Sequence, residues 1–152
     1  MKQTTMLLLG ILFCCVTQLA AAQPTNTATG MKPTVVTPDS LKFAQDPQSP
    51  KGVLVAIVEG NPNSGPYTVR LKIPAGTFYP AHFHGDTERV TILEGTVWFG
   101  VGDVADKSKA MPYGPGTYVS VPKGLHHFAI AQTDVLLQIS GVGPTTTTMV
   151  KQ

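Results

Sequence analysis

Between residues 52 and 143 the sequence is a series of short apolar segments, separated at nearly every joint by glycine, proline or aspartate. Residues 67–74, YTVRLKIP, alternate between apolar and polar side chains, which is the period of a half-buried strand. No window keeps helical periodicity for three turns. Segments of strand length cover residues 53–60, 67–74, 77–85, 88–95, 96–103, 116–122, 126–131 and 134–141. Many short strands predict an all-β fold, a small antiparallel barrel or sandwich, from residue 34 to residue 152.

The first 22 residues are typical of a secretory signal peptide. A basic start at Lys2 is followed by an apolar run at residues 6–16, well short of the roughly 20 residues that a membrane-spanning helix needs. Ala20 and Ala22 occupy the small-residue positions of a cleavage site. We therefore expect cleavage after Ala22 and a periplasmic or secreted mature protein. The alternatives are an uncleaved membrane anchor and lipid attachment at a cysteine of the leader.

Cysteine content and charge restrict what the mature chain can do. Both cysteines, Cys14 and Cys15, lie in the leader, so the mature chain has neither a thiol nor a disulfide. Without Lys2 it carries ten basic and nine acidic residues, a net charge of +1, and no basic run. We expect neither nucleic acid nor, after cleavage, a membrane as partner. Residues 23–33 are polar and without periodicity, which indicates a flexible arm.

Two histidines and a glutamate lie together in the stretch PAGTFYPAHFHGDTERVTILEG, residues 74–95. His82 and His84 are two residues apart, so on a strand they project from the same face. Two imidazoles side by side inside a barrel are costly without partners, and a divalent cation would satisfy both. Glu88 follows at an even offset, so its carboxylate can return to the same point after an intervening turn. These three residues form a candidate set of metal ligands.

A later segment supplies a fourth candidate ligand. His126 and His127 are adjacent, and neighbouring residues of a strand face opposite sides, so only one of them can reach the same metal. The local sequence does not decide between the two.

The spacing of these residues resembles the two motifs of the cupin superfamily. The matching positions are Gly76, His82, His84, Glu88 and Gly95 for the first motif, and Gly116, Pro122, Gly124 and His127 for the second. The resemblance implies a small antiparallel β-barrel, a double-stranded β-helix or jelly roll, with a metal near one mouth. It selects His127 as the fourth metal ligand and leaves His126 as a surface or neighbouring residue.

The resemblance covers about residues 52–143, and one position departs from it. Ala131 stands where the second motif usually has asparagine, so any role of that asparagine is not carried over. Residues 102–103 and 141–144 also resemble features of exported cupins with a single domain.

Three imidazoles and one carboxylate suit one divalent transition metal (Mn, Fe, Co, Ni, Cu or Zn) better than Ca or Mg. Four ligands leave two adjacent positions of an octahedral ion open, for a bidentate substrate or for substrate and dioxygen. The sequence therefore indicates a metal-dependent oxidoreductase, dioxygenase-like, acting on a small molecule. Two alternatives stay open. One is a metal-dependent lyase or isomerase, which a tyrosine or His126 as base would favour; the other is a non-catalytic periplasmic ligand-binding or sensing module.

Alternation also predicts the surroundings of the metal. Val90 and Ile92 share the face of Glu88, and two alanines share that of His127, so we expect a small, mainly apolar pocket without Arg or Lys. Tyr79, Tyr113 and Tyr118 are candidates for a phenolic proton near the metal, although each is also typical of strand packing.

The outer surface carries two further expectations. The aromatic residues Phe83, Trp98 and Phe128 are outward apolar candidates for pairing two copies, so we expect a homodimer. Residues 100–116 form one long irregular stretch, which we interpret as a surface loop, with a loop at the barrel mouth as the alternative.

Overall fold

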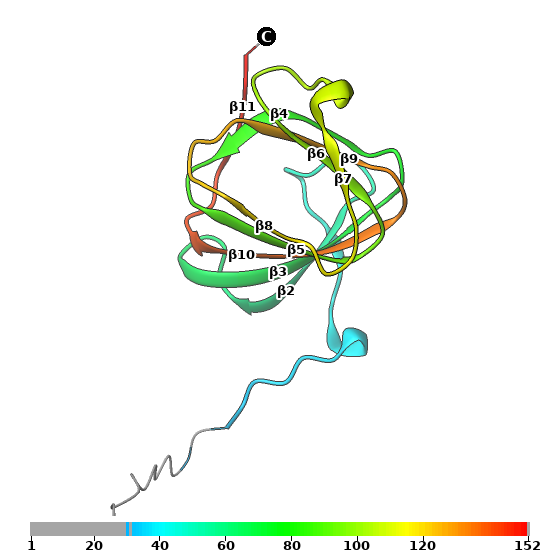
Figure 1. Cartoon of the computed structure of the whole chain (residues 1–152). Helices are drawn as coiled ribbons and strands as arrows, with labels where there is room; N and C mark the ends of the chain where they lie inside the picture. Colours follow the sequence, from blue (N-terminus) through cyan, green and yellow to red (C-terminus); the bar gives the residue numbers. More distant parts are fainter. Residues whose placement is uncertain (1–29, 31, 152) are drawn as a thin grey trace, which may run out of the picture. The chain divides into compact units, whose positions relative to one another are not determined.

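Two antiparallel β-sheets face each other in the computed structural model, which describes residues 30 and 32–151 (Figure 1). Val35–Gln152 form one compact unit. The signal-peptide prediction for residues 1–22 lies outside the described residues, as does most of the arm predicted at 23–33. No helix in the described part of the chain has the length and apolar character needed to span a membrane.

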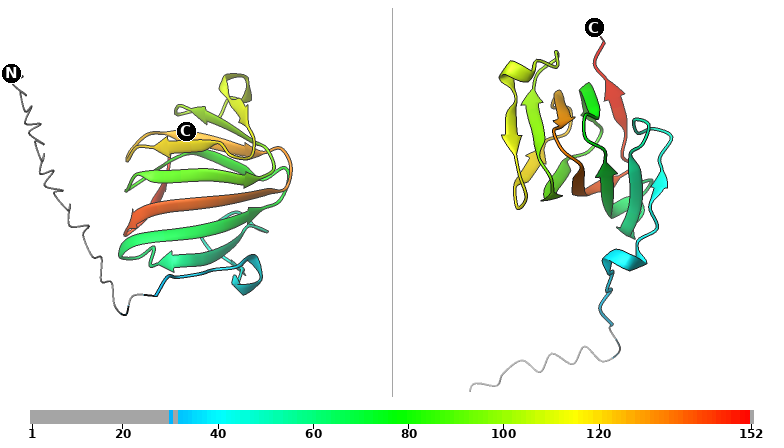
Figure 2. Two further views of the ribbon diagram at one scale, coloured as in Figure 1. Left: turned by 60° about the horizontal axis from the view of Figure 1, so that its bottom comes forward. Right: turned by 90° about the vertical axis from the view of Figure 1, so that its right-hand side faces the viewer.

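The larger sheet has the strand order β1-β2-β3-β10-β5-β8, and the smaller sheet has the order β11-β4-β9-β6-β7 (Figures 1 and 2). The strands are β1 (Ala44–Gln45), β2 (Leu54–Gly60), β3 (Gly65–Ile73), β4 (Phe78–His84), β5 (Glu88–Glu94), β6 (Val97–Val101), β7 (Met111–Tyr113), β8 (Tyr118–Val121), β9 (His127–Ala131), β10 (Val135–Gly143) and β11 (Thr147–Met149). Among the described residues no strand pair joins the two sheets, so hydrogen bonds do not close the barrel. This is the predicted jelly-roll architecture.

All eight strand segments predicted from the sequence are strands in the structure. The described residues contain no α-helix, only the short 3-10 helices η1 (Pro38–Ser40) and η2 (Lys107–Lys109). The stretch 100–116, interpreted as a loop, holds η2 and the short strand β7, which pairs with β6. β1 and β11 were not predicted either.

The core lies between the sheets, and β3 shows how alternation builds it. Tyr67, Val69 and Ile73 are buried on the inner face. On the outer face Arg70 donates from Nε to Gln138 Oε1 at 3.2 Å, and the Lys72 ammonium lies 4.4 Å from the Phe43 ring centroid. Each fully buried aliphatic or aromatic side chain of this kind stabilises the fold by roughly 1.5–3 kcal/mol.

The expectation that Phe128 faces outward for dimerisation is wrong. Phe128 is 0% exposed, and its ring lies across Gly100, its cross-strand partner on β6. A side chain at position 100 would collide with that ring, so the glycine makes room for the aromatic residue. Trp98 is partly exposed, with its Nε1 donating to Gln132 Oε1 at 2.7 Å, and Phe83 is also partly exposed.

Candidate metal centre

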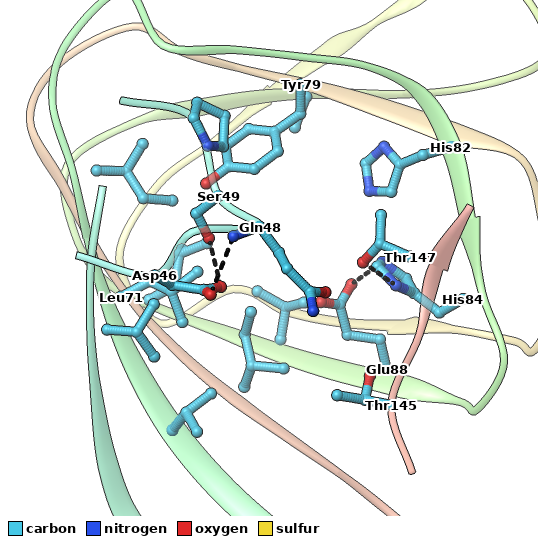
Figure 3. A pocket seen from close by; sticks show the side chains of 18 of the residues that line it. Asp46, Gln48, Ser49, Leu71, Tyr79, His82, His84, Glu88, Thr145 and Thr147 are labelled. Atoms are coloured by element: carbon cyan, nitrogen blue, oxygen red, sulfur yellow. Dashed lines mark hydrogen bonds and ion pairs between the residues drawn. The ribbon is translucent and has the colours of Figure 1, made fainter. Parts of the chain in front are cut away.

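His82, His84 and His127 converge between the sheets (Figure 3 shows the first two). His82 and His84 project from β4, and His127 begins β9, where it pairs directly with His82. One nitrogen from each ring lies within 4.8 Å of the other two. The side chains are buried, with residue exposures of 6%, 9% and 3% in chain order. The structure therefore brings together all three histidines that were predicted as ligands.

Each of the three imidazoles is held through Nδ1 by a backbone carbonyl. The acceptors are Pro80 O for His82 at 2.6 Å, Thr146 O for His84 at 3.2 Å and Leu125 O for His127 at 2.9 Å. A carbonyl only accepts, so Nδ1 carries the proton and each Nε2 presents a lone pair. Protein-bound metals are typically held by histidines whose other nitrogen is fixed in this way.

A tight turn brings His127 to the other two histidines. Gly124 has a φ of +78°, a backbone conformation that favours glycine, and its N–H donates to His84 O at 3.0 Å. This hydrogen bond fastens the turn between β8 and β9 to the end of β4. His127 follows three residues later, already beside β4.

Glu88 reaches the same point from the opposite sheet, at the start of β5. Its Oε2 lies 3.5 Å from His84 Nε2 and 3.9 Å from His127 Nε2, and its side chain is 16% exposed. Glu88 therefore lies where the sequence placed it, next to the histidine cluster.

Burial controls the protonation of the cluster. It lowers the pKa of His127 to about 4, and the neighbouring His82 and His84 add to the effect, whereas the hydrogen bond that His127 donates to the Leu125 carbonyl opposes it. Burial also lowers the pKa of His82 and of His84. It raises the pKa of Glu88 to about 7, with a smaller contribution from the negative charge of Asp86. The imidazoles are thus neutral near pH 7, which is the form that binds metals.

The donor set fits a divalent transition metal. The buried Nε2 of His84 has no hydrogen-bond partner among the described residues, which is costly for a polar atom in this position. A cation between the three Nε2 atoms would satisfy it. Imidazole nitrogens suit Mn, Fe, Co, Ni, Cu and Zn alike, so the identity of the metal stays open. The three histidines can bind a metal in this arrangement.

A cavity of about 820 Å³ adjoins the cluster. Val90, Ile92, Ala129 and Ala131 line it, as alternation predicted, and no Arg or Lys is among the lining residues. The mainly apolar character is confirmed, but the predicted small size is wrong, because 820 Å³ is near the upper end of the range of about 300–1,000 Å³ for ligand pockets.

The sequence matches the model of a protein family described as the ChrR cupin-like domain, over residues 31–145. The chain belongs to this cupin family. The match includes all four predicted ligands, and the fold is the one that the two motifs indicated.

Solved structures share the architecture of this cupin at low sequence identity. The polyketide cyclase RemF from Streptomyces resistomycificus is 17% identical with a TM-score of 0.66, covering 80% of this chain and 87% of its own. A putative acetylacetone dioxygenase from Methylibium petroleiphilum PM1 is 19% identical, with a TM-score of 0.60 and coverage of 78% and 82%.

An RmlC-like cupin from Shewanella frigidimarina NCIMB 400 is 15% identical, with a TM-score of 0.59 and coverage of 73% and 91%. At these sequence identities the similarity shows a shared fold and nothing more. No protein of curated function matches the sequence.

His126 faces away from the cluster in this cupin. Its Nδ1 lies 2.6 Å from Asp103 Oδ1, and its ring stacks on Phe83 with centroids 4.9 Å apart. Its side chain is 36% exposed. The structure thus separates the two adjacent histidines as strand geometry requires.

A β-bulge places a further residue on the cavity wall. The register of β4 against β9 shifts between Tyr79 and His82, where Pro80 has no N–H to donate. The extra residue lets Tyr79 and His82, three positions apart, both line the cavity. Tyr79 Oη is buried without a partner among the described residues, and burial raises its pKa to about 12. Of the other two candidate tyrosines, Tyr113 lines the cavity and Tyr118 does not.

Asp86 has a different role from a simple turn residue. Its carboxylate accepts hydrogen bonds from Tyr67 Oη at 3.3 Å, Val142 N at 3.3 Å and Thr145 Oγ1 at 3.0 Å. Asp86 therefore ties the turn between β4 and β5 to β3, to β10 and to the segment after β10.

Proposed function

We propose that this protein is an exported, metal-dependent oxidoreductase, dioxygenase-like, that acts on a small molecule with a mainly apolar body. The observation that carries the proposal is the convergence of three neutral imidazoles from one sheet and the Glu88 carboxylate from the other beside an apolar cavity. The fold shared with a putative acetylacetone dioxygenase supports this reaction class by analogy alone.

In the proposal His82, His84, His127 and Glu88 hold the metal. When bound, a redox-active metal would supply Lewis acidity and an electron path to dioxygen. The protein itself positions the ligands and shapes the environment of the substrate. Backbone carbonyls fix the imidazoles, so no ligand has to be reoriented on binding. The aliphatic lining packs against the carbon skeleton of a substrate and displaces water from the metal side of the cavity.

A metal-dependent lyase or isomerase is the second candidate, and the buried Tyr79 hydroxyl on the cavity lining favours it as a proton donor, although neither Tyr79 nor His126 is placed as the base that the sequence suggested. A phenol whose pKa is raised to about 12 stays protonated at pH 7, so it can donate a proton or a hydrogen bond but is a poor base. RemF, a polyketide cyclase, shows that the fold also accommodates chemistry of another class.

Metal content and oxygen consumption together test the proposal. The protein without residues 1–22 is purified, stripped with chelator, reconstituted separately with Mn, Fe, Co, Ni, Cu and Zn, and analysed by plasma mass spectrometry. We expect about one ion per chain, and oxygen uptake with one redox-active metal in a panel of β-diketones and phenols. Failure to retain any of these metals overturns the metal site. Retention with no oxygen uptake overturns the oxidoreductase assignment and directs the screen to elimination and isomerisation.

Export is tested separately. The full chain is expressed in a bacterial host, and the periplasmic fraction is analysed by intact mass spectrometry. We expect a mature chain beginning at Gln23. A cytoplasmic product that retains Met1 would remove export from the proposal.

A further inference from the structure

The turn formed by residues 46–50 lines the cavity that the histidines line. It joins β1 to β2, far from the two metal-binding motifs in the sequence. In Figure 3 its side chains lie across the cavity from His82 and His84, and Gln48 extends from the turn toward Glu88.

Side chains hold this turn in one conformation. Asp46 accepts from Gln48 N at 3.1 Å and from Ser49 Oγ at 3.0 Å. Gln45 bridges its ends, donating to Asp46 O at 2.9 Å and accepting from Gly52 N at 3.0 Å. A turn built in this way presents the residue at its tip in a defined position, as an Asx turn typically does.

The Gln48 carboxamide is the polar group that the turn leaves available. The side chains of Gln45, Asp46 and Ser49 are used within the turn, whereas the Gln48 amide has no hydrogen-bond partner among the residues that the structure describes. Gln48 is also exposed, so it lies at the mouth of the cavity, where an entering molecule meets it. Its amide offers both donors and an acceptor without a charge.

The charges around the cavity restrict what can enter. Glu88 and Asp46 are its acidic lining residues, and no Arg or Lys lines it. A divalent cation held by the histidines would offset these two negative charges, so a carboxylate ligand would find neither a cationic side chain nor a net positive charge in the cavity. An uncharged oxygen-bearing molecule needs no such charge and can still accept a hydrogen bond from an amide.

We propose that the 46–50 turn is the specificity element of the metal cavity, and that the Gln48 carboxamide hydrogen-bonds an uncharged, oxygen-bearing ligand held beside the three histidines. This inference rests on the proposed function for its metal, but the residues of the 46–50 turn are not among the proposed metal ligands. Gln48 is a positioning residue in it. Asp46 fixes the turn and adds negative potential at the mouth.

The test compares two probes of nearly equal size by isothermal titration calorimetry on the zinc-loaded protein. One is 2,5-hexanedione, an uncharged molecule with two carbonyl oxygens, and the other is levulinate, which carries a carboxylate in place of one acetyl group. The variants are Gln48→Met, which keeps the length but removes the amide, and Gln48→Lys, which adds a cation. Gln138→Met, on the outer face of β10, is the matched control. Zinc content and melting temperature are measured for every variant.

We expect wild type to bind 2,5-hexanedione more tightly than levulinate. Gln48→Met should weaken 2,5-hexanedione binding about three- to tenfold, as for one net hydrogen bond, at unchanged zinc content. Gln48→Lys should shift the preference toward levulinate, a gain that loss of structure would not produce. Gln138→Met should behave as wild type.

Two results overturn the inference: wild-type affinities in both Gln48 variants, or no binding of either probe to zinc-loaded wild type. A protein that holds no zinc but binds 2,5-hexanedione in a Gln48-dependent way would refute the proposed function and leave this inference standing.

Discussion

Replacing Glu88 by glutamine should stabilise the metal-free protein and weaken the metal-bound one. The carboxylate lies 3.5 Å from His84 Nε2 with 16% of its side chain exposed, and no cationic side chain lines its cavity. Without a metal, ionising Glu88 places a negative charge in a largely dry site. Glutamine has nearly the same shape and cannot ionise.

The size of the effect follows from the pKa of Glu88, which burial raises from 4.5 to about 7. A difference of about 2.5 pH units, at 1.36 kcal/mol for each, corresponds to about 3 kcal/mol. Because the folded-state pKa is the higher one, this penalty is absent below pH 4.5, grows as the pH rises and is complete above about pH 7. The stability advantage of Glu88→Gln should therefore grow by about 3 kcal/mol between pH 4.5 and pH 8.

Urea unfolding in excess chelator, followed by tryptophan fluorescence from Trp98, measures the free energy of unfolding at both pH values. Comparing the two pH values cancels any constant difference between amide and acid. Glu94→Gln is the matched control, because Glu94 is exposed at the far end of the same strand and should give no pH-dependent difference. With zinc in place of chelator, Glu88→Gln should instead be less stable than wild type. The substitution removes one anionic ligand, so zinc binds the folded protein less tightly and stabilises it less.

The measured quantity is the free energy of unfolding of Glu88→Gln minus that of wild type in chelator. If this difference is smaller at pH 8 than at pH 4.5, the reasoning is refuted. It would mean that ionised Glu88 has a favourable partner in the metal-free protein. An increase in stability that persists with zinc would show instead that Glu88 is no metal ligand.

Four further outcomes are expected. His127→Ala should reduce zinc affinity by more than the roughly 10–100-fold typical of losing a group that only orients a ligand, and His126→Ala should change it little; plasma mass spectrometry after dialysis compares them. In the Glu88→Gln background with chelator, the free energy of unfolding should fall as the pH drops from 6.5 toward 4. The three histidines bind protons in the unfolded chain at these pH values, whereas burial lowers their pKa in the folded protein. Urea titrations across that range measure this fall, and a flat profile would contradict it. Asp86→Asn should cost about 1–3 kcal/mol, because it removes a half-buried charged acceptor of three hydrogen bonds, with chemical denaturation as the measurement. Light scattering at micromolar concentration should give the mass of a homodimer, and Trp98→Glu that of a monomer.

Strong local patterns made most of this fold predictable. The alternation in β3 and the turn residues between segments were enough to place eight strands, because the period of two is a property of each strand alone. β1, β7 and β11 are only two or three residues long in the structure, too short for a period to appear. They form because longer neighbours offer them an edge to pair with.

The convergence of the candidate metal ligands was predictable because their spacing is set within strands and tight turns. Tyr79 was only one of three candidate tyrosines, and Gln48 was not assigned to the cavity at all. A bulge at Pro80 changes the phase of β4, so simple alternation from His82 would put Tyr79 on the other face. Gln48 lines the cavity only because the fold brings the 46–50 turn to it, which no local pattern records. Phe128 was misplaced because the glycine that accommodates it lies on another strand.

The hydrogen bond from His84 Nδ1 to Thr146 O joins residues 62 positions apart, and β11 pairs along the strand that carries two of the candidate ligands. During synthesis these two histidines emerge well before the carbonyl that orients one of them. Under the proposed function, a partly emerged chain would therefore hold an ion only loosely, and tight retention would require β11 to be paired. A protease cut near residue 146 should then weaken metal retention while the two sheets stay folded.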